Sequence, residues 1–178
     1  MNLPVPLGQC FEYGTLRSLR KADVAPMLEW MHDEGTARLF TRDFRSVTEL
    51  EAVEFVRSSW DSTENVHLAV ASATGSYLGT VSLKRLDWKN ESAEYAIAMH
   101  PEGRGTGASL KGTHDLLELA FKELNLHRVY LCVRESNLRA KRFYEKAGFT
   151  YEGLARDAIR DGESFEGLEW WSILNGEL

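Results

Sequence analysis

The chain is poor in cysteine and contains no long apolar run, and these absences exclude several classes of protein. Its 178 residues include two cysteines, Cys10 and Cys132, which stand far apart and without the close spacing of metal ligands. Cys132 lies inside an apolar stretch, as an ordinary core residue does. We therefore expect neither a disulfide nor a metal site. We also expect no membrane-spanning helix, because no stretch of about 18 consecutive apolar residues is present.

The N-terminal residues and the charge balance narrow the class further. Residues 1–8 lack the basic and apolar regions of a signal peptide, which predicts a cytoplasmic protein. The formal net charge is −6, from 21 basic and 27 acidic residues, which argues against a nucleic-acid surface and favours cationic partners. No repeat or low-complexity linker interrupts the chain, and 43% hydrophobic content suffices for a core. Residues 1–178 are predicted to form one domain.

A glycine-rich segment at residues 100–110 is the first of two segments that indicate chemistry. It follows an apolar run and opens an amphipathic segment, so a strand, a glycine turn and a helix are predicted in that order. Gly103, Gly105 and Gly107 let the backbone approach a ligand closely, and the unpaired amides of a helix start favour an anion such as a pyrophosphate. Arg104 adds a positive charge there. Turns of this kind also occur as plain connections.

Two nucleotide-binding classes do not fit this turn. No Gly-Lys-Ser/Thr follows the glycines, and no Rossmann-type acidic residue follows a second parallel strand. A P-loop protein or a dinucleotide-binding protein is therefore not expected.

The second segment, residues 137–149, changes the interpretation of the first. Arg104-Gly-Thr-Gly-Ala-Ser109 resembles the Arg/Gln-x-x-Gly-x-Gly/Ala signature of the GNAT superfamily of N-acetyltransferases, with Ser109 where the pattern has Gly or Ala. Asn137-x-x-Ala140 and Tyr144-Glu-Lys-x-Gly-Phe149 resemble the later motif of that superfamily, in the same order and at fitting spacing. The resemblance implies a site for acetyl-coenzyme A (acetyl-CoA) as co-substrate.

The predicted order of elements, βααβββαβαββ, is similar to that superfamily across essentially the whole chain. Alternation predicts strands at 13–19, 67–73, 77–86, 93–99, 128–133, 151–158 and 167–173. Helical spacing predicts a helix capped by Asp23, one opened by the capping box Thr48 to Glu51 with Leu50 on its apolar side, and two more at 110–124 and 137–146. The resemblance implies an α/β (α+β) GNAT fold: a central mixed, mostly antiparallel sheet of six to seven strands, splayed at the cofactor site and flanked by about four helices.

Positions that match the motifs are expected to hold the co-substrate. The resemblance implies that the pantetheine arm pairs with the backbone of Ile97, Ala98 and Met99, as an amide chain can imitate a missing strand. The remaining cofactor residues that it implies are Arg104, Gly105, Thr106, Gly107, Ala108, Ser109, Asn137, Ala140 and Tyr144. Asn137 caps the helix, hydrogen-bonds the pantetheine, or does both.

Direct acetyl transfer needs a neutral amine, an oxyanion stabiliser and a proton source for the departing thiolate. The resemblance implies that Tyr144 protonates or hydrogen-bonds the leaving sulfur; the alternative is a core aromatic on a helix. Glu94 is the leading candidate for the base that takes the proton of the amine, unless its carboxylate faces solvent. His67 and His100 are its chemical rivals, although a lone histidine is more often structural.

The acceptor is set, by resemblance, in the first two helices, their loop and the C-terminal strands. Acidic residues occur there within 32–34, 40–44 and 157–163, and they suit a polyamine or a basic peptide terminus, or are solvated loop charges. The tail is similar to the subgroup of ribosomal-protein N-terminal and spermidine acetyltransferases, many of which lack the tyrosine that stands here at 144. We expect a small-molecule amine (polyamine, amino sugar or amino acid), with a peptide N-terminus as the alternative. The resemblance also suggests a homodimer.

A catalytically idle acyl-CoA-binding module is the alternative from a different class. Tyr144 together with an intact glycine turn favours the enzyme, because only catalysis requires a hydroxyl beside the thioester. No nucleic-acid or membrane partner is expected, and amine attack on a thioester needs no metal.

Overall fold

A computed structural model describes residues 6–37, 40 and 43–178 of the chain, which form a mixed α/β fold around one eight-stranded sheet in the order β1-β2-β3-β4-β5-β6-β8-β7. The strands are β1 (Glu12–Tyr13), β2 (Leu16–Ser18), β3 (Val66–Ala71), β4 (Tyr77–Asp87), β5 (Ser92–Met99), β6 (Arg128–Arg134), β7 (Thr150–Asp161) and β8 (Ser164–Leu174). The α-helices are α1 (Val24–His32), α2 (Glu34–Ala37), α3 (Glu49–Asp61), α4 (Ala108–Glu118) and α5 (Leu138–Lys146). In the part of the chain that the structure describes, no helix is long and apolar enough to cross a membrane.

The predicted first strand, 13–19, is a tight hairpin of two short strands, which raises the strand number above six to seven. Gly14 has a φ of 58°, and a Cβ there would lie 2.5 Å from a carboxylate oxygen of Asp115. That carboxylate accepts hydrogen bonds from the Thr15 amide at 2.7 Å and the Thr15 hydroxyl at 2.6 Å. The turn is therefore held by a residue 100 positions away, a contact that local alternation cannot reveal.

Two predicted details of the first helices are corrected. Asp23 makes no capping hydrogen bond to α1; instead its carboxylate pairs with the Arg17 guanidinium at 2.7 and 2.8 Å, with both residues buried. Leu50 is 78% exposed, because the buried face of α3 runs through Ala52 and Val56 and Leu50 stands about 200° around the helix from Ala52. The capping box of α3 is confirmed. The Thr48 hydroxyl accepts from the Glu51 amide, and the Thr48 amide donates to the Glu51 carboxylate.

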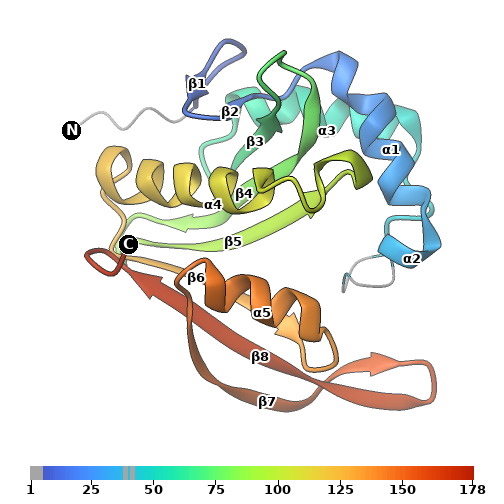
Figure 1. Ribbon diagram of the computed structural model, residues 1–178, viewed down its shortest axis with the longest axis vertical. Coiled ribbons are helices and arrows are strands. Elements are labelled where there is room, and N and C mark those ends of the chain that lie inside the picture. The colour runs from blue at the N-terminus through green and yellow to red at the C-terminus, as the bar shows by residue number, and fades with distance from the viewer. Residues whose placement is uncertain (1–5, 38–39, 41–42) are drawn as a thin grey trace.

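Helices pack on both faces of the central strands β3 and β4. α4 lies across the front of the sheet, while α1 and α3 lie behind it (Figure 1). β3 shows how the sequence supports two layers: Leu68 and Val70 join the core cluster that contains the α4 leucines, whereas Ala69 packs with Met27 of α1 in a second cluster. α5 covers the last three strands, and the long β7–β8 hairpin extends beyond it (Figure 1).

The sheet splays open between β5 and β6, as expected. These parallel strands pair only from Ser92–Arg128 to Glu94–Tyr130. Beyond that point β5 stays paired with β4 as far as Met99, and β6 stays paired with β8 as far as Arg134. The facing edges of β5 and β6 diverge, and this divergence opens the site described next.

Candidate active site

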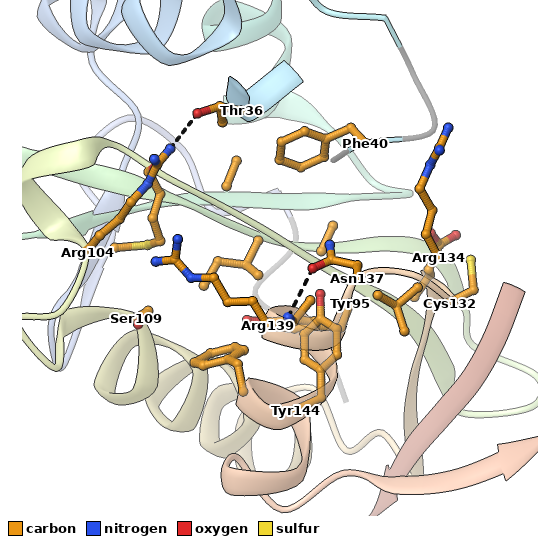
Figure 2. Close-up of a pocket in the computed structure, with 18 of the residues that line it drawn as sticks. Thr36, Phe40, Tyr95, Arg104, Ser109, Cys132, Arg134, Asn137, Arg139 and Tyr144 are labelled. Atoms are coloured by element: carbon orange, nitrogen blue, oxygen red, sulfur yellow. Dashed lines mark hydrogen bonds between the residues drawn. The ribbon is translucent and has the colours of Figure 1, made fainter. Parts of the chain in front are cut away.

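A cavity of about 290 Å³ lies at the splay, between β5, β6, the start of α4 and α5 (Figure 2). The predicted site residues that line it are Glu94, Ile97, Ala98, Met99, Arg104, Gly105, Ser109, Asn137, Ala140 and Tyr144. Thr106, Gly107 and Ala108 are not among its lining residues and form the turn into α4. The motifs therefore converge on one cavity, although they are separated in the chain.

The backbone of β5 forms one wall of the cavity. Ile97, Ala98 and Met99 pair with β4 along one edge only, and these three residues are half-buried. The other edge is left without a partner strand, so its amide and carbonyl groups can pair with an amide chain. This edge fits the pantetheine arm of acetyl-CoA.

The glycine turn at the start of α4 fits an anion. Gly105 and Gly107 have φ values of 75° and 85°, in the left-handed region that favours glycine. The Thr106 hydroxyl donates to the Gly103 carbonyl at 2.9 Å and accepts from the Ala108 amide at 3.2 Å, so the turn is braced from within. The following amides of the first helical turn have no preceding carbonyl to bond, and they suit the pyrophosphate of coenzyme A.

Arg104 and Arg139 both line the cavity, and they lie in different environments (Figure 2). The Arg104 guanidinium donates to the Met99 carbonyl at 3.2 and 3.3 Å and to the Thr36 hydroxyl at 2.7 Å. Its side chain is therefore engaged by protein groups. Arg139 projects from α5 into the cavity, and among the described residues no carboxylate pairs with it. Arg139, which carried no motif signal, is therefore a further cation that can meet a phosphate.

Tyr144 stands on α5 with its ring packed edge-on against Tyr95 and Phe149, at centroid distances of 6.2 and 5.9 Å. Burial, and to a smaller extent Cys132, raises the pKa of the Tyr144 phenol above its usual value. Its hydroxyl has no hydrogen-bond partner within the described ranges, and Tyr144 lines the cavity. The phenol therefore keeps its proton at neutral pH and can offer it to a bound group.

Asn137 is confirmed as a helix cap, because its side-chain oxygen accepts from the Ala140 amide at 3.1 Å. The same side chain lines the cavity (Figure 2). Its amide nitrogen can still donate, so capping and ligand binding are compatible.

Glu94 lines the cavity as a buried carboxylate held by two cations. One oxygen accepts from the Lys84 ammonium at 2.7 Å, and the other lies 3.1 Å from the Arg85 guanidinium. The Lys84 and Arg85 side chains are 35% and 76% exposed, so the Arg85 contact is the one nearer to solvent. To accept a proton from an amine, Glu94 would have to exchange one of these contacts.

The two histidine rivals lie outside the cavity lining. His67 bonds the Ser82 hydroxyl at 2.7 Å, and burial together with Lys84 lowers its pKa to about 4. His100 bonds a carboxylate oxygen of Glu29 at 2.9 Å. Both histidines are thus engaged by structural partners.

The remaining lining residues were not among the predicted site residues. The cavity is also lined by Thr36, Phe40, Lys84, Tyr95, Ala96, Cys132, Val133, Arg134, Arg139 and Phe143. Phe40 packs against Trp30 and Phe44 at centroid distances of 5.6 and 5.2 Å. The lining residues of this group come from α2, β4, β5, β6, α5 and the segment around Phe40. Cys132, expected as an ordinary core residue, is partly exposed and lines the cavity.

The described acidic residues that were predicted for the acceptor side are not among the lining residues of the cavity. The Asp33 carboxylate accepts from the Thr36 amide at 2.8 Å and the Thr36 hydroxyl at 2.5 Å, bonds that lower the pKa of Asp33. Asp43 pairs with Arg45 at 2.9 Å. Asp157 and Glu163 are exposed on the β7–β8 hairpin, and residues 41 and 42 lie outside the described residues. Within residues 6–37, 40 and 43–178, no group of three His, Cys, Asp or Glu side chains is arranged to hold a metal.

Comparisons with known proteins agree with this geometry. Residues 15–150 match the family model of the acetyltransferase (GNAT) domain. The spermidine N(1)-acetyltransferase of Vibrio cholerae is 31% identical over 144 residues, which cover 78% of this chain and 80% of that protein. A putative ribosomal N-acetyltransferase of Bacillus subtilis is 34% identical over 103 residues, which cover 58% and 56%. The crystal structure of the Vibrio cholerae spermidine N-acetyltransferase in complex with CoA and spermine has the same fold, with a TM-score of 0.83, 24% identity, and coverage of 92% of this chain and 96% of that one.

Proposed function

This chain belongs to the GNAT acetyltransferase family, and we propose that it transfers the acetyl group of acetyl-CoA to a primary amine of a polyamine such as spermidine. The observation that carries the proposal is the cavity at the β5–β6 splay. On one side, called the co-substrate side, it has the free edge of β5 at residues 97–99 and the glycine turn. On the other, called the acceptor side, it has the Phe40 ring and the Glu94 carboxylate. An ammonium chain with methylene spacers suits the second side, because Phe40 can pack on methylenes or on a cation and Glu94 can attract an ammonium.

The residues of the first side fit the co-substrate. The β5 edge at 97–99 would hold the pantetheine amides, the α4 turn and Arg139 would hold the pyrophosphate, and Asn137 can donate to the arm. Bound acetyl-CoA supplies the activated thioester carbonyl that an amine attacks. The protein's own part is to position the two reactants and to exclude water.

Two proton-transfer roles are proposed. The raised pKa of Tyr144 keeps its hydroxyl protonated, so that it can donate to a leaving thiolate and be neutral again after reprotonation. Glu94 is proposed to take the proton of the ammonium when an acceptor displaces the contact with the exposed Arg85. An amine with a pKa near 10.4 is mostly charged at neutral pH, so this proton must leave before attack.

The test is a free-thiol release assay with acetyl-CoA, scanned over spermidine, spermine, amino sugars, amino acids and short peptides. The proposal predicts thiol release that depends on the polyamine and saturates with it. Release with peptides alone would favour acetylation of a peptide N-terminus, the second candidate, which the putative ribosomal N-acetyltransferase relative supports. CoA binding without release for any amine would favour a non-catalytic module.

The Glu94 role has its own experiment. Glu94→Gln removes the base but keeps the shape, so kcat is expected to fall by about 10- to 100-fold with loss of the acidic limb of its pH profile. Lys84→Met is the control, because it removes the partner but leaves the carboxylate in place. An unchanged pH profile in Glu94→Gln would rule out the assignment.

We also propose where the protein is located and how it assembles. Both cysteines are free thiols, which suits the reducing cytoplasm. A homo-oligomer is proposed because a dodecameric structure of the Vibrio cholerae enzyme shares the fold, at a TM-score of 0.74 and 25% identity.

A further inference from the structure

Arg104 connects the two sides of the cavity. It follows the strand β5, yet its guanidinium reaches across to α2 and donates to the Thr36 hydroxyl at 2.7 Å (Figure 2). The same group also holds the Met99 carbonyl at 3.2 and 3.3 Å. The Arg104 side chain therefore joins the end of β5, on the co-substrate side, to α2, on the acceptor side.

α2 depends on such contacts because it is very short. Its four residues, Glu34–Ala37, form a single turn, and an isolated turn is not stable in water. Its anchors are the Asp33 carboxylate, which accepts from the Thr36 amide and hydroxyl, and the bond from Arg104. Thr36 is only 4% exposed, so an unmade hydrogen bond there would be costly.

The position of α2 sets the acceptor side of the cavity. The Phe40 amide donates to the Ala37 carbonyl at 3.2 Å, which attaches Phe40 to the end of the helix. Phe40 in turn lines the cavity. The path from the co-substrate strand to the acceptor wall is thus continuous: Met99, Arg104, Thr36, Ala37, Phe40.

We propose that Arg104 is a positioning residue whose bridge to Thr36 couples the two substrates, so that each binds more tightly when the other is present. A ligand along β5 holds the Met99 carbonyl in place and excludes water from the guanidinium, which strengthens its remaining hydrogen bonds. The bridge then holds α2 and Phe40 in the arrangement that binds the acceptor. Coupling of this kind is reciprocal. The inference rests on the proposed function only for the identity of the acceptor.

The first test needs no acceptor. Hydrogen exchange of peptides covering residues 33–40 is measured in the wild-type protein with and without saturating CoA. The bridge predicts that CoA slows exchange in the peptides that contain Thr36 and Phe40, although both residues lie on the acceptor side. Unchanged exchange in residues 33–40, with protection confined to β5, α4 and α5, would overturn the proposal.

The second test breaks the bridge from the α2 side. Thr36→Val removes the hydroxyl but keeps the shape, so CoA should no longer protect residues 33–40, while its Kd, measured by calorimetry, changes less than about threefold. The acceptor KM should rise by up to about fivefold, the effect expected for the loss of Phe40, with kcat within about twofold. Thr36→Ser is the matched control, because it keeps the hydroxyl and should behave as the wild type. Retained protection in Thr36→Val would contradict the bridge.

The third test breaks the bridge from the other side and covers the case in which Thr36→Val fails to fold. Arg104→Lys keeps the charge but cannot bond the Met99 carbonyl and the Thr36 hydroxyl with one planar group. It should reproduce the loss of protection and the rise in acceptor KM. The variant that carries both Thr36→Val and Arg104→Lys should show an acceptor KM no higher than that of the more affected single variant. Additive effects would contradict a shared bridge.

The proposed function can fail without the bridge, and the reverse also holds. If no polyamine releases thiol but CoA still protects residues 33–40 through Thr36, only the acceptor is wrong. If polyamines release thiol and CoA leaves that segment unchanged, only the bridge is wrong.

Discussion

The two sides of the cavity are built from different materials. The co-substrate side consists mainly of backbone: the unpaired edge of β5 and the amides of a left-handed glycine turn. The acceptor side consists of side chains, chiefly Phe40 on the α2 segment, the Glu94 carboxylate with its two cations, and Arg134 on β6. A backbone wall tolerates most substitutions as long as φ and ψ are kept, whereas a side-chain wall changes with every substitution. Substitutions are therefore expected to change the acceptor more readily than the co-substrate.

Tyr144 stands where the two sides meet, and its removal should have the largest effect. Tyr144→Phe is expected to lower kcat by about 100-fold with little change in stability, because the lost hydroxyl has no partner within the described residues and the ring is kept. Steady-state thiol release and thermal unfolding measure the two quantities. Tyr77→Phe is the control: its hydroxyl bonds Trp30 at 3.2 Å and Thr80 at 2.8 Å, so stability should fall by about 1 kcal/mol and kcat should hold. An active Tyr144→Phe would remove the proton-donor role.

His67 provides a test outside both sides. Because burial lowers its pKa to about 4, against about 6.5 unfolded, its contribution to stability is complete above pH 6.5 and is lost as the pH falls toward 4. Between pH 7.5 and pH 5 this loss amounts to about 2 kcal/mol. Chemical denaturation should show that much less pH dependence in His67→Gln, with the pH profile of kcat unchanged. A shifted kcat profile would return His67 to the list of bases.

Gly107 tests the glycine turn on the co-substrate side. Its φ of 85° disfavours any residue with a Cβ, although nothing lies within 4 Å of a Cβ placed there. Gly107→Ala should cost about 1–2 kcal/mol in the left-handed region, and relaxation of the turn should raise the Kd for CoA about tenfold, as calorimetry can measure. Gly162→Ala carries similar strain at a φ of 62° with equally open space, on the β7–β8 hairpin, and should leave the Kd unchanged. Equal effects of the two variants on Kd would contradict an anion site in the turn.

Phe40 tests the acceptor side, and its removal has the smallest expected effect on the kinetics. Phe40→Ala removes a ring from the acceptor wall, so the acceptor KM should rise about fivefold while the Kd for CoA stays constant. Phe165→Ala is the matched control, since Phe165 is 60% exposed on the β7–β8 hairpin. A weaker CoA affinity in Phe40→Ala, with an unchanged acceptor KM, would exchange the proposed roles of the two sides.

The co-substrate side was largely predictable from sequence because its signals are local. The glycine turn, the capping asparagine and the alternation of β5 each need only a few neighbouring residues, and the structure brings them to one cavity. The predicted roles of Glu94, Tyr144 and the co-substrate residues stay predictions until they are measured.

Glu94 and the segment around Phe40 were named from the sequence, but the rest of the acceptor side was not predictable because its members meet only in the folded chain. Thr36, Cys132 and Arg134 lie on α2 and β6 without a shared motif, and the Arg104 bridge spans 68 residues. The expected role of Arg104 at the pyrophosphate rested on its position in the turn and stays a prediction, and its bonds to Met99 and Thr36 could not be foreseen from that position. The split of the first strand at Gly14 has the same origin, a contact with the distant Asp115.

The proposed function requires that both sides of the cavity are occupied together when the acetyl group moves. Thiol release by the wild-type enzyme, measured over a matrix of acetyl-CoA and spermidine concentrations, tests this requirement. Direct transfer in a ternary complex predicts double-reciprocal lines that intersect. Parallel lines would show that the enzyme is acetylated first and that CoA leaves before the amine binds, and they would rule out direct transfer.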